Sequence, residues 1–258
     1  MQTVLFHSTI FGPIHSRRLG SSLGVNLSPS DGKICSFDCL YCEAGYNAQG
    51  PGASGLPPRP EVARLLDEKL ASMREAGEGL DVITFSGNGE PTIHPDFAGI
   101  IDDTIALRDK YFPQVKISVL TNSTMLGRPQ VVEALRKVDN NILKLDSAIE
   151  RTVQLLDRPN PSYRLGEVIE QLTQFGGSGI IQTMITRGNH NGETVDNSTD
   201  EEIAALIEAY RRIKPRSIMI YSIDRRTPEQ SLQKVEKPEL RAIAARITEA
   251  TGIEVSVA

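Results

Sequence analysis

Three cysteines lie close together in the chain, at Cys35, Cys39 and Cys42, and no other cysteine is present. An odd number of thiols in so short a segment suits a metal ligand set better than a disulfide framework. Structural zinc sites and ferredoxin-type clusters normally take four protein ligands. With three thiolates, one iron of a cubane cluster would stay open to a small molecule.

Packing and zinc binding are the two alternatives for the three cysteines. The thiols could be unligated packing residues, or they could bind zinc with one histidine as the fourth ligand. The histidines of the chain are His7, His15, His94 and His190. Packing alone gives no reason for the short, regular spacing of the three cysteines, and a zinc site would need a fourth ligand.

A glycine-rich segment, Ser86-Gly87-Asn88-Gly89-Glu90, follows a predicted strand. Glycines at a strand end let the backbone approach a ligand closely, and the Glu90 carboxylate can accept hydrogen bonds from an ammonium group. An ordinary turn is the alternative for such a segment taken alone.

Polar residues also end later predicted strands. Thr121 and Asn122 close one of them, and another ends in the segment 144–147, Lys-Leu-Asp-Ser. Polar groups at the carboxyl ends of barrel strands usually face the ligand cleft, because burial without partners is costly. Ser147 could instead cap the following helix.

Two arginine pairs flank the predicted strands. Arg17 and Arg18 precede the first strand, and Asp224 precedes Arg225 and Arg226 after the sixth. A guanidinium fork binds carboxylate or phosphate bidentately. Most surface arginine pairs are simply solvated, so this signal is weak.

Short, apolar, β-branched segments alternate with helical periodicity along the chain. The predicted strands are 23–27, 82–86, 116–120, 142–146, 180–185 and 217–222. Pro60 and the pattern from Thr199 to Glu202 mark two helix starts. This alternation predicts an α/β fold, a partial (βα)6 barrel of parallel strands whose carboxyl ends share one cleft.

We expect one domain over residues 1–258, with a core barrel at about 20–225 and a C-terminal helix and edge strand at about 237–258. Residues 44–60 and 187–198 are rich in turn-forming residues, and we expect loops there. Both could border the cleft.

The formal net charge of −5 argues against a general nucleic-acid binder. No apolar run of about 18 residues is present, so we expect no membrane segment. The N-terminal residues do not resemble a signal peptide, and we therefore expect a cytoplasmic protein.

The pattern C-x-x-x-C-x-x-C, with Tyr41 before the last cysteine, resembles the signature of the radical S-adenosylmethionine (SAM) superfamily. In that superfamily a 4Fe-4S cluster binds SAM at its open iron and cleaves it reductively to methionine and a 5′-deoxyadenosyl radical, which abstracts hydrogen from a substrate. A partial (βα)6 barrel with the cluster loop after the first core strand is also what the resemblance implies.

The resemblance implies roles for the remaining motifs. The segment ending in Glu90 is similar to the Gly-Gly-Glu motif that binds the SAM amino group, with Asn88 in place of a glycine. Cys35, Cys39 and Cys42 become the implied cluster ligands. The implied SAM-binding residues are Tyr41, Ser86, Gly87, Asn88, Gly89, Glu90, Asn122, Asp146 and Gln182, with Thr183 as a further candidate. The candidates for substrate contact are Arg17, Arg18, Tyr221 and Asp224, and Arg225 is a further candidate. No catalytic acid or base can be named.

Taken together, the segments 12–20, 35–42, 87–92 and 221–225 resemble a group of small radical SAM proteins classed with the tRNA wyosine-base synthases. This chain lacks the cysteines that bind the second cluster in those synthases. A glycyl-radical protein activase is another alternative, although the activase N-terminal motif is not evident. The substrate, whether small molecule, protein or RNA, is not identified, and the expected partner is a flavodoxin or ferredoxin reductant. Two alternatives without enzymatic activity would use the same cysteines: an iron-sulfur electron carrier and a zinc-stabilised binding domain.

Overall fold

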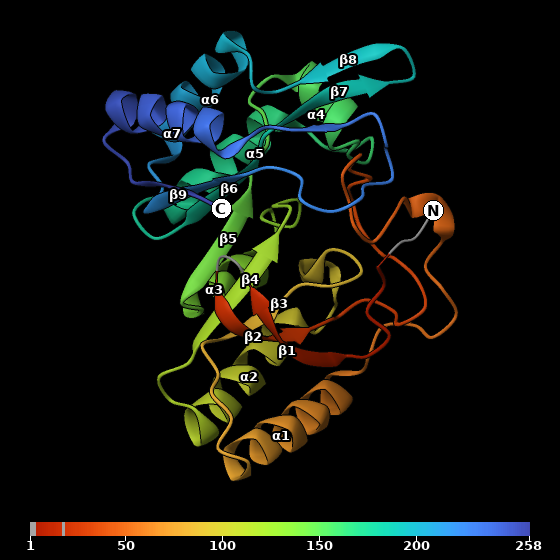
Figure 1. Cartoon of the computed structure of the whole chain (residues 1–258). Coiled ribbons are helices and arrows are strands. Elements are labelled where there is room, and N and C mark those ends of the chain that lie inside the picture. The colour runs from red at the N-terminus through yellow and green to blue at the C-terminus, as the bar shows by residue number, and fades with distance from the viewer. Residues whose placement is uncertain (1–3, 17–18) are drawn as a thin grey trace.

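The structure, a computed structural model, describes residues 4–16 and 19–258 (Figure 1). Its main sheet has the strand order β1-β2-β3-β4-β5-β6-β9-β11. The strands are β1 (Ile10–Ser16), β2 (Gly20–Val25), β3 (Val82–Phe85), β4 (Lys116–Thr121), β5 (Asn140–Lys144), β6 (Ile180–Met184), β9 (Ser217–Tyr221) and β11 (Val255–Val257). Neighbours from β2 to β11 pair in parallel, and β1 pairs antiparallel with β2. The predicted α/β fold with a largely parallel sheet is confirmed.

The helices that follow the strands pack on one face of the curved sheet (Figure 1). They are α1 (Arg59–Glu75), α2 (Phe97–Tyr111), α3 (Pro129–Lys137), α4 (Glu150–Leu156), α5 (Leu165–Leu172), α6 (Asp200–Ile213) and α7 (Lys237–Thr251). Side chains of alternate strand residues, such as Val25, Phe85, Val119 and Ile181, form the core with these helices. This alternation is what a sheet with only one helix-covered face requires.

The opposite face of the sheet carries polar side chains. Thr84 pairs with Ser118 across β3 and β4, and Lys144 pairs with Gln182 across β5 and β6. The Ser22 hydroxyl lies 2.8 Å from the Thr84 hydroxyl. Polar groups on this face therefore bond to one another instead of packing against helices.

A second small sheet occupies the stretch 187–198, where the sequence predicted a loop. It has the order β10-β7-β8 and consists of β7 (Thr186–His190), β8 (Glu193–Asp196) and β10 (Gln233–Lys234). The prediction was wrong because the glycine, asparagine and aspartate content masks a hairpin, which turns through Asn191 at a φ of 52° and Gly192 at 86°. β1, α3 and α4 also lie outside the predicted elements.

Several contacts attach the hairpin to the rest of the molecule, and two of them bear on the cysteine segment. The His190 ring Nδ1 lies 2.6 Å from Glu229 Oε2. Val195 and Leu232 are buried with Leu40 and Leu156 in a small apolar cluster apart from the main core. The hairpin therefore packs against the segment that contains the cysteines.

The predicted capping box at α6 is confirmed in part. The Thr199 hydroxyl accepts a hydrogen bond from the Glu202 amide at 3.3 Å. The Glu202 carboxylate does not return to Thr199, but accepts hydrogen bonds from the hydroxyls of Ser147 (2.6 Å) and Thr152. The Ser147 hydroxyl therefore binds a side chain in the first turn of α6.

Within the described residues, no helix combines the length and the apolar character needed to cross a bilayer.

The contact between His190 and Glu229 predicts a pH-dependent stability. The hydrogen bond from His190 lowers the pKa of the Glu229 carboxyl. Its stabilising effect is therefore present above the ordinary pKa of a glutamate and is lost as the pH falls through the lowered value. We expect Glu229→Gln to unfold at lower urea concentration than the wild type at pH 7, and the difference to shrink in acid.

The matched control is Glu193→Gln, which changes an exposed carboxylate of the same hairpin. It should leave the unfolding midpoint unchanged at both pH values. A difference between Glu229→Gln and the wild type that stayed constant from neutral to acid pH would contradict the assignment.

Candidate functional site

The cysteine segment lies across the carboxyl ends of the strands. Ile34 forms an isolated parallel bridge with Gly89, and Phe37 forms an antiparallel bridge with Pro159. The Leu40 amide donates to the Leu156 carbonyl at 2.9 Å. Backbone hydrogen bonds therefore fix the loop on both sides, to the end of β3 and to the end of α4.

The three thiols share one environment. All three are free cysteines; Cys39 is buried, and Cys35 and Cys42 are half-buried. Burial, together with smaller contributions from Glu90 and Cys42, raises the pKa of Cys35 to about 12. Burial also raises the pKa of Cys39 well above its ordinary value, with smaller contributions from Cys42 and Cys35. Bound iron would reverse this preference, since only thiolates ligate a metal.

Within the part of the chain that the structure describes, no three His, Cys, Asp or Glu side chains converge on a point that one metal ion could occupy. Such convergence is what a zinc site requires. The thiolates of a cubane bind different irons, so they need only surround the cluster. His94 and His190, two candidates for a fourth zinc ligand, instead contact the Pro57 carbonyl at 3.0 Å and Glu229. Three thiolates are the type of donor that an iron-sulfur cluster takes.

The glycines after β3 have a steric role. A Cβ on Gly89 would lie 1.9 Å from the Ile34 carbonyl oxygen, and one on Gly87 would lie 2.3 Å from Asn26 Oδ1. Glycine at position 89 therefore allows the cysteine loop to approach the end of β3.

Glu90 is buried and bonded to protein donors. Its Oε1 accepts from the Thr92 amide (3.0 Å), the Thr92 hydroxyl (2.5 Å) and the Thr121 hydroxyl (2.7 Å), and its Oε2 accepts from the Asn122 amide (2.6 Å). Burial raises the pKa of this carboxyl, and these donors act against that increase. The carboxylate thus connects the ends of β3 and β4.

Asn88 is fully buried and holds the N-terminal segment. It pairs with the Phe6 backbone, accepting from the amide at 2.8 Å and donating to the carbonyl at 2.9 Å. It also donates to the Pro29 carbonyl at 2.9 Å. The residue that departs from the glycine-rich motif therefore has contacts of its own within the protein.

A buried charge cluster lies beneath the cysteine loop. Asp146 Oδ2 accepts hydrogen bonds from Tyr41 and Lys144, and its Oδ1 accepts from the Met184 amide at 2.9 Å. Lys144 Nζ also lies 2.9 Å from Asp157 Oδ1. Burial opposes the charged form of Lys144, but the two carboxylates outweigh it and raise the pKa of the ammonium group.

Sequence reasoning did not assign Lys144 or Asp157 to the site. A lysine inside an apolar strand segment was an available signal, because a buried ammonium group needs anionic partners. Asp157 lies in a segment without a clear pattern, so only the fold brings it to Lys144.

Gln182 and Thr183 lie on opposite faces of β6. Gln182 is paired in register with Lys144 and is buried on the polar face. The Thr183 hydroxyl donates to the Leu145 carbonyl and lies 2.7 Å from the Tyr210 hydroxyl of α6. Thr183 therefore faces the helices.

Two of the substrate-side candidates lie together with Tyr41. Tyr221 and Asp224 line a cavity of about 50 Å³ with Tyr41 and Met184. Asp224 pairs with Lys234 at 2.9 Å, and the neighbouring Arg225 pairs with Glu43 at 2.6 Å. Arg17 and Arg18 lie outside the described residues.

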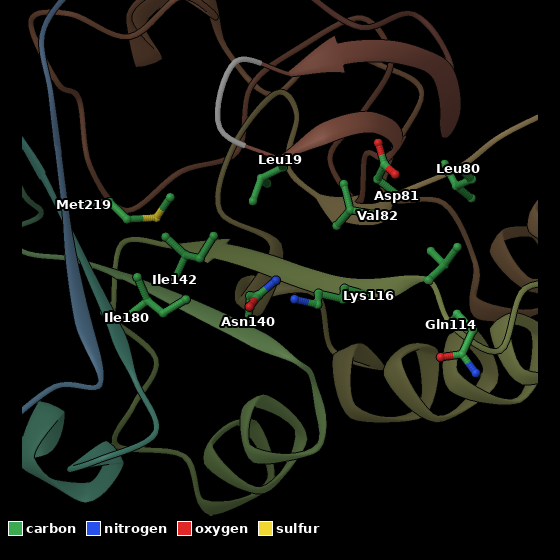
Figure 2. A pocket seen from close by; sticks show the side chains of 11 residues that line it. Leu19, Leu80, Asp81, Val82, Gln114, Lys116, Asn140, Ile142, Ile180 and Met219 are labelled. Atoms are coloured by element: carbon green, nitrogen blue, oxygen red, sulfur yellow. The ribbon is translucent and has the colours of Figure 1, made fainter. Parts of the chain in front are cut away.

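A larger cavity, of about 600 Å³, lies at the other end of the strands (Figure 2). Asp81, Lys116 and Asn140, at or near the amino ends of their strands, line it with Ile180 and Met219. Its lining includes none of the cysteines, so it is separate from the cysteine site.

Comparisons with known proteins agree with this arrangement. The chain is 26% identical over 257 residues to a protein named GTPase Obg from Brachyspira hyodysenteriae, covering 96% of this chain but 35% of that protein. It is 27% identical over 251 residues to a UPF0026 protein of Methanocaldococcus jannaschii, covering 94% of this chain and 72% of that protein. The chain therefore spans only about a third of the first of these relatives.

Among solved structures, a radical SAM methyltransferase from Sphaerobacter thermophilus has a TM-score of 0.67 at 18% identity, covering 92% of this chain and 65% of that one. This likeness concerns the fold. The family model of the radical SAM superfamily matches residues 30–200, which include the three cysteines and the segment after β3. The chain belongs to the radical SAM superfamily of enzymes, which use a 4Fe-4S cluster and S-adenosylmethionine.

Proposed function

We propose that Cys35, Cys39 and Cys42 ligate three irons of a 4Fe-4S cluster, and that the enzyme uses this cluster to cleave SAM and abstract hydrogen from a substrate. The bound cluster supplies one electron to the sulfonium of SAM, which yields methionine and a 5′-deoxyadenosyl radical. The remaining steps depend on how the protein holds SAM and the substrate.

One observation carries the proposal: three free thiols share a single loop that is fixed across the carboxyl ends of the strands. Ligands in barrel enzymes bind at this end of the strands. A loop with backbone hydrogen bonds on both sides holds its thiolates in place, so little ordering remains to be done when the cluster binds.

The segment Ser86–Glu90 is the proposed site for the SAM amino group. Four protein donors already occupy the Glu90 oxygens. We therefore assign the ammonium contact to backbone carbonyls of residues 86–89, with the Glu90 carboxylate joining this segment to the end of β4.

Lys144 is the proposed partner of the SAM carboxylate, and Tyr41, Asp146 and Gln182 are the polar residues around it. Lys144 is half-buried and carries the positive charge that a carboxylate needs. Tyr41 and Asp146 hold its ammonium group in place.

The substrate remains unidentified, and we place it against Tyr221 and Asp224, which line the small cavity beside Tyr41. A flavodoxin or ferredoxin is the proposed electron donor. Free thiols and a low-potential cluster both require a reducing compartment, which favours the cytoplasm.

Anaerobic reconstitution with iron and sulfide, followed by dithionite and SAM, tests the proposal. We expect a brown protein that releases 5′-deoxyadenosine and methionine. A brown protein that leaves SAM intact would indicate an electron carrier, and a colourless protein loaded with zinc would indicate a binding domain.

Replacing any one ligand should remove the activity while the fold persists. We expect Cys35→Ala, Cys39→Ala and Cys42→Ala each to lower iron content and reduce 5′-deoxyadenosine release to background, because a cubane with two protein ligands is poorly held. Iron analysis, chromatography of the nucleoside and circular dichroism provide the measurements. His15→Ala, an exposed candidate zinc ligand, is the control and should retain full activity. Wild-type turnover in any cysteine variant would refute the ligand assignment.

Glu90→Gln separates a supporting role from direct contact with SAM. The amide can accept at one atom only, so buried donors lose their partner, and we expect the free energy of unfolding of the iron-free protein to fall by about 1–3 kcal/mol. Urea denaturation measures this, with exposed Glu61→Gln as the control. Unchanged stability together with lost SAM binding would instead assign the Glu90 carboxylate directly to the SAM ammonium group.

A further inference from the structure

The side-chain amide of Asn122 reaches one of the proposed cluster ligands. Its Nδ2 lies 3.6 Å from the Cys35 sulfur and 2.9 Å from the Ser36 hydroxyl oxygen. Hydrogen bonds to sulfur are longer than those to oxygen because the sulfur atom is larger. The NH2 group has two hydrogens, so it can serve both acceptors.

The hydrogen-bond network determines which end of the amide faces the sulfur. Asn122 Oδ1 accepts from the Thr124 amide at 3.1 Å and from the Thr124 hydroxyl at 2.7 Å. A backbone amide can only donate, so the oxygen must lie on the Thr124 side. The NH2 group consequently points at Cys35.

The backbone at Asn122 is held equally firmly. Its amide donates to Glu90 Oε2 at 2.6 Å. The next residue, Ser123, is buried and has a φ of 68°, a region that non-glycine residues seldom occupy. Such conformations persist only where the surroundings enforce them, and they cluster at functional sites.

We propose that Asn122 is a positioning residue that stabilises the reduced state of the cluster by donating a hydrogen bond to the Cys35 sulfur. This inference rests on the proposed function, because it requires Cys35 to be a cluster ligand. Reduction transfers one electron from an external one-electron donor and changes no covalent bond or proton. It makes the sulfur ligands more negative, and an N–H group aimed at a sulfur favours that state; hydrogen bonds to sulfur are one determinant of cluster potential.

The test measures the midpoint potential of the reconstituted protein in a dithionite titration without SAM. Electron paramagnetic resonance monitors the amount of reduced cluster. A hydrogen bond of about 1 kcal/mol corresponds to about a fivefold change in the ratio of reduced to oxidised cluster at fixed solution potential. For a one-electron couple that is a shift of about 40 mV. We expect Asn122→Ala to shift the potential by about this amount to more negative values. Asn122→Asp should shift it further, because a carboxylate oxygen replaces the donor.

Asn47→Ala is the matched control. Asn47 Nδ2 donates to the Cys35 and Phe37 carbonyls, so this variant loosens the same loop without touching a sulfur. Its potential should equal that of the wild type even if it holds less iron. Full clusters with wild-type potential in Asn122→Ala and Asn122→Asp would overturn the inference.

If the Asn122 variants bind no iron, pulsed electron paramagnetic resonance of the reduced wild-type protein labelled with 15N-asparagine decides the question. It detects a nitrogen that is hydrogen-bonded to a cluster sulfur, and Asn122 is the asparagine whose amide lies 3.6 Å from the Cys35 sulfur. A 15N coupling supports the inference, and its absence in a protein with a full cluster overturns it. Failure of the wild-type protein itself to form a cubane would refute the proposed function instead.

Discussion

The buried carboxylate of Glu90 is the interaction on which the site depends most. Its two oxygens join the turn after β3 to the end of β4, through Thr92, Thr121 and Asn122. The Glu90 amide also donates to the Ile34 carbonyl at 3.0 Å, just before the first cysteine. A single residue thus connects two strand ends and the cysteine loop. Loss of a buried acceptor is costly, because each donor it serves is left without a partner.

Much of the fold could be predicted from the sequence. The six core strands have short, apolar segments, and their alternation with helical periodicity requires parallel pairing. Burial in the core of Val25, Phe85 and Ile181 confirms that reasoning. The β7–β8 hairpin was not predicted. Its Asn191-Gly192 turn is a local hairpin signal, but the flanking strands are mostly polar, and Val195 packs with Leu40 and Leu232 only in the folded protein.

The site is only partly predictable, for a physical reason. Cysteine spacing is a local property, so the cysteine loop can be recognised from the sequence alone. The partners of a polar side chain depend on where the fold places it. Asn88 follows the end of β3 and Thr183 lies within β6, near its carboxyl end, as expected, yet Thr183 faces Tyr210 and Asn88 binds Phe6. Lys144 and Asp157 meet only because β5 and the end of α4 adjoin the same loop.

The contacts of the cysteine loop also have a consequence for biosynthesis. The loop leaves the ribosome before most of the residues that position it, since Gly89, Asn122, Leu156 and Glu229 all follow it in the chain. It therefore cannot reach its folded conformation until Glu229, beyond β9, has been made. The arrangement of the three thiols thus depends on synthesis of residues far along the chain.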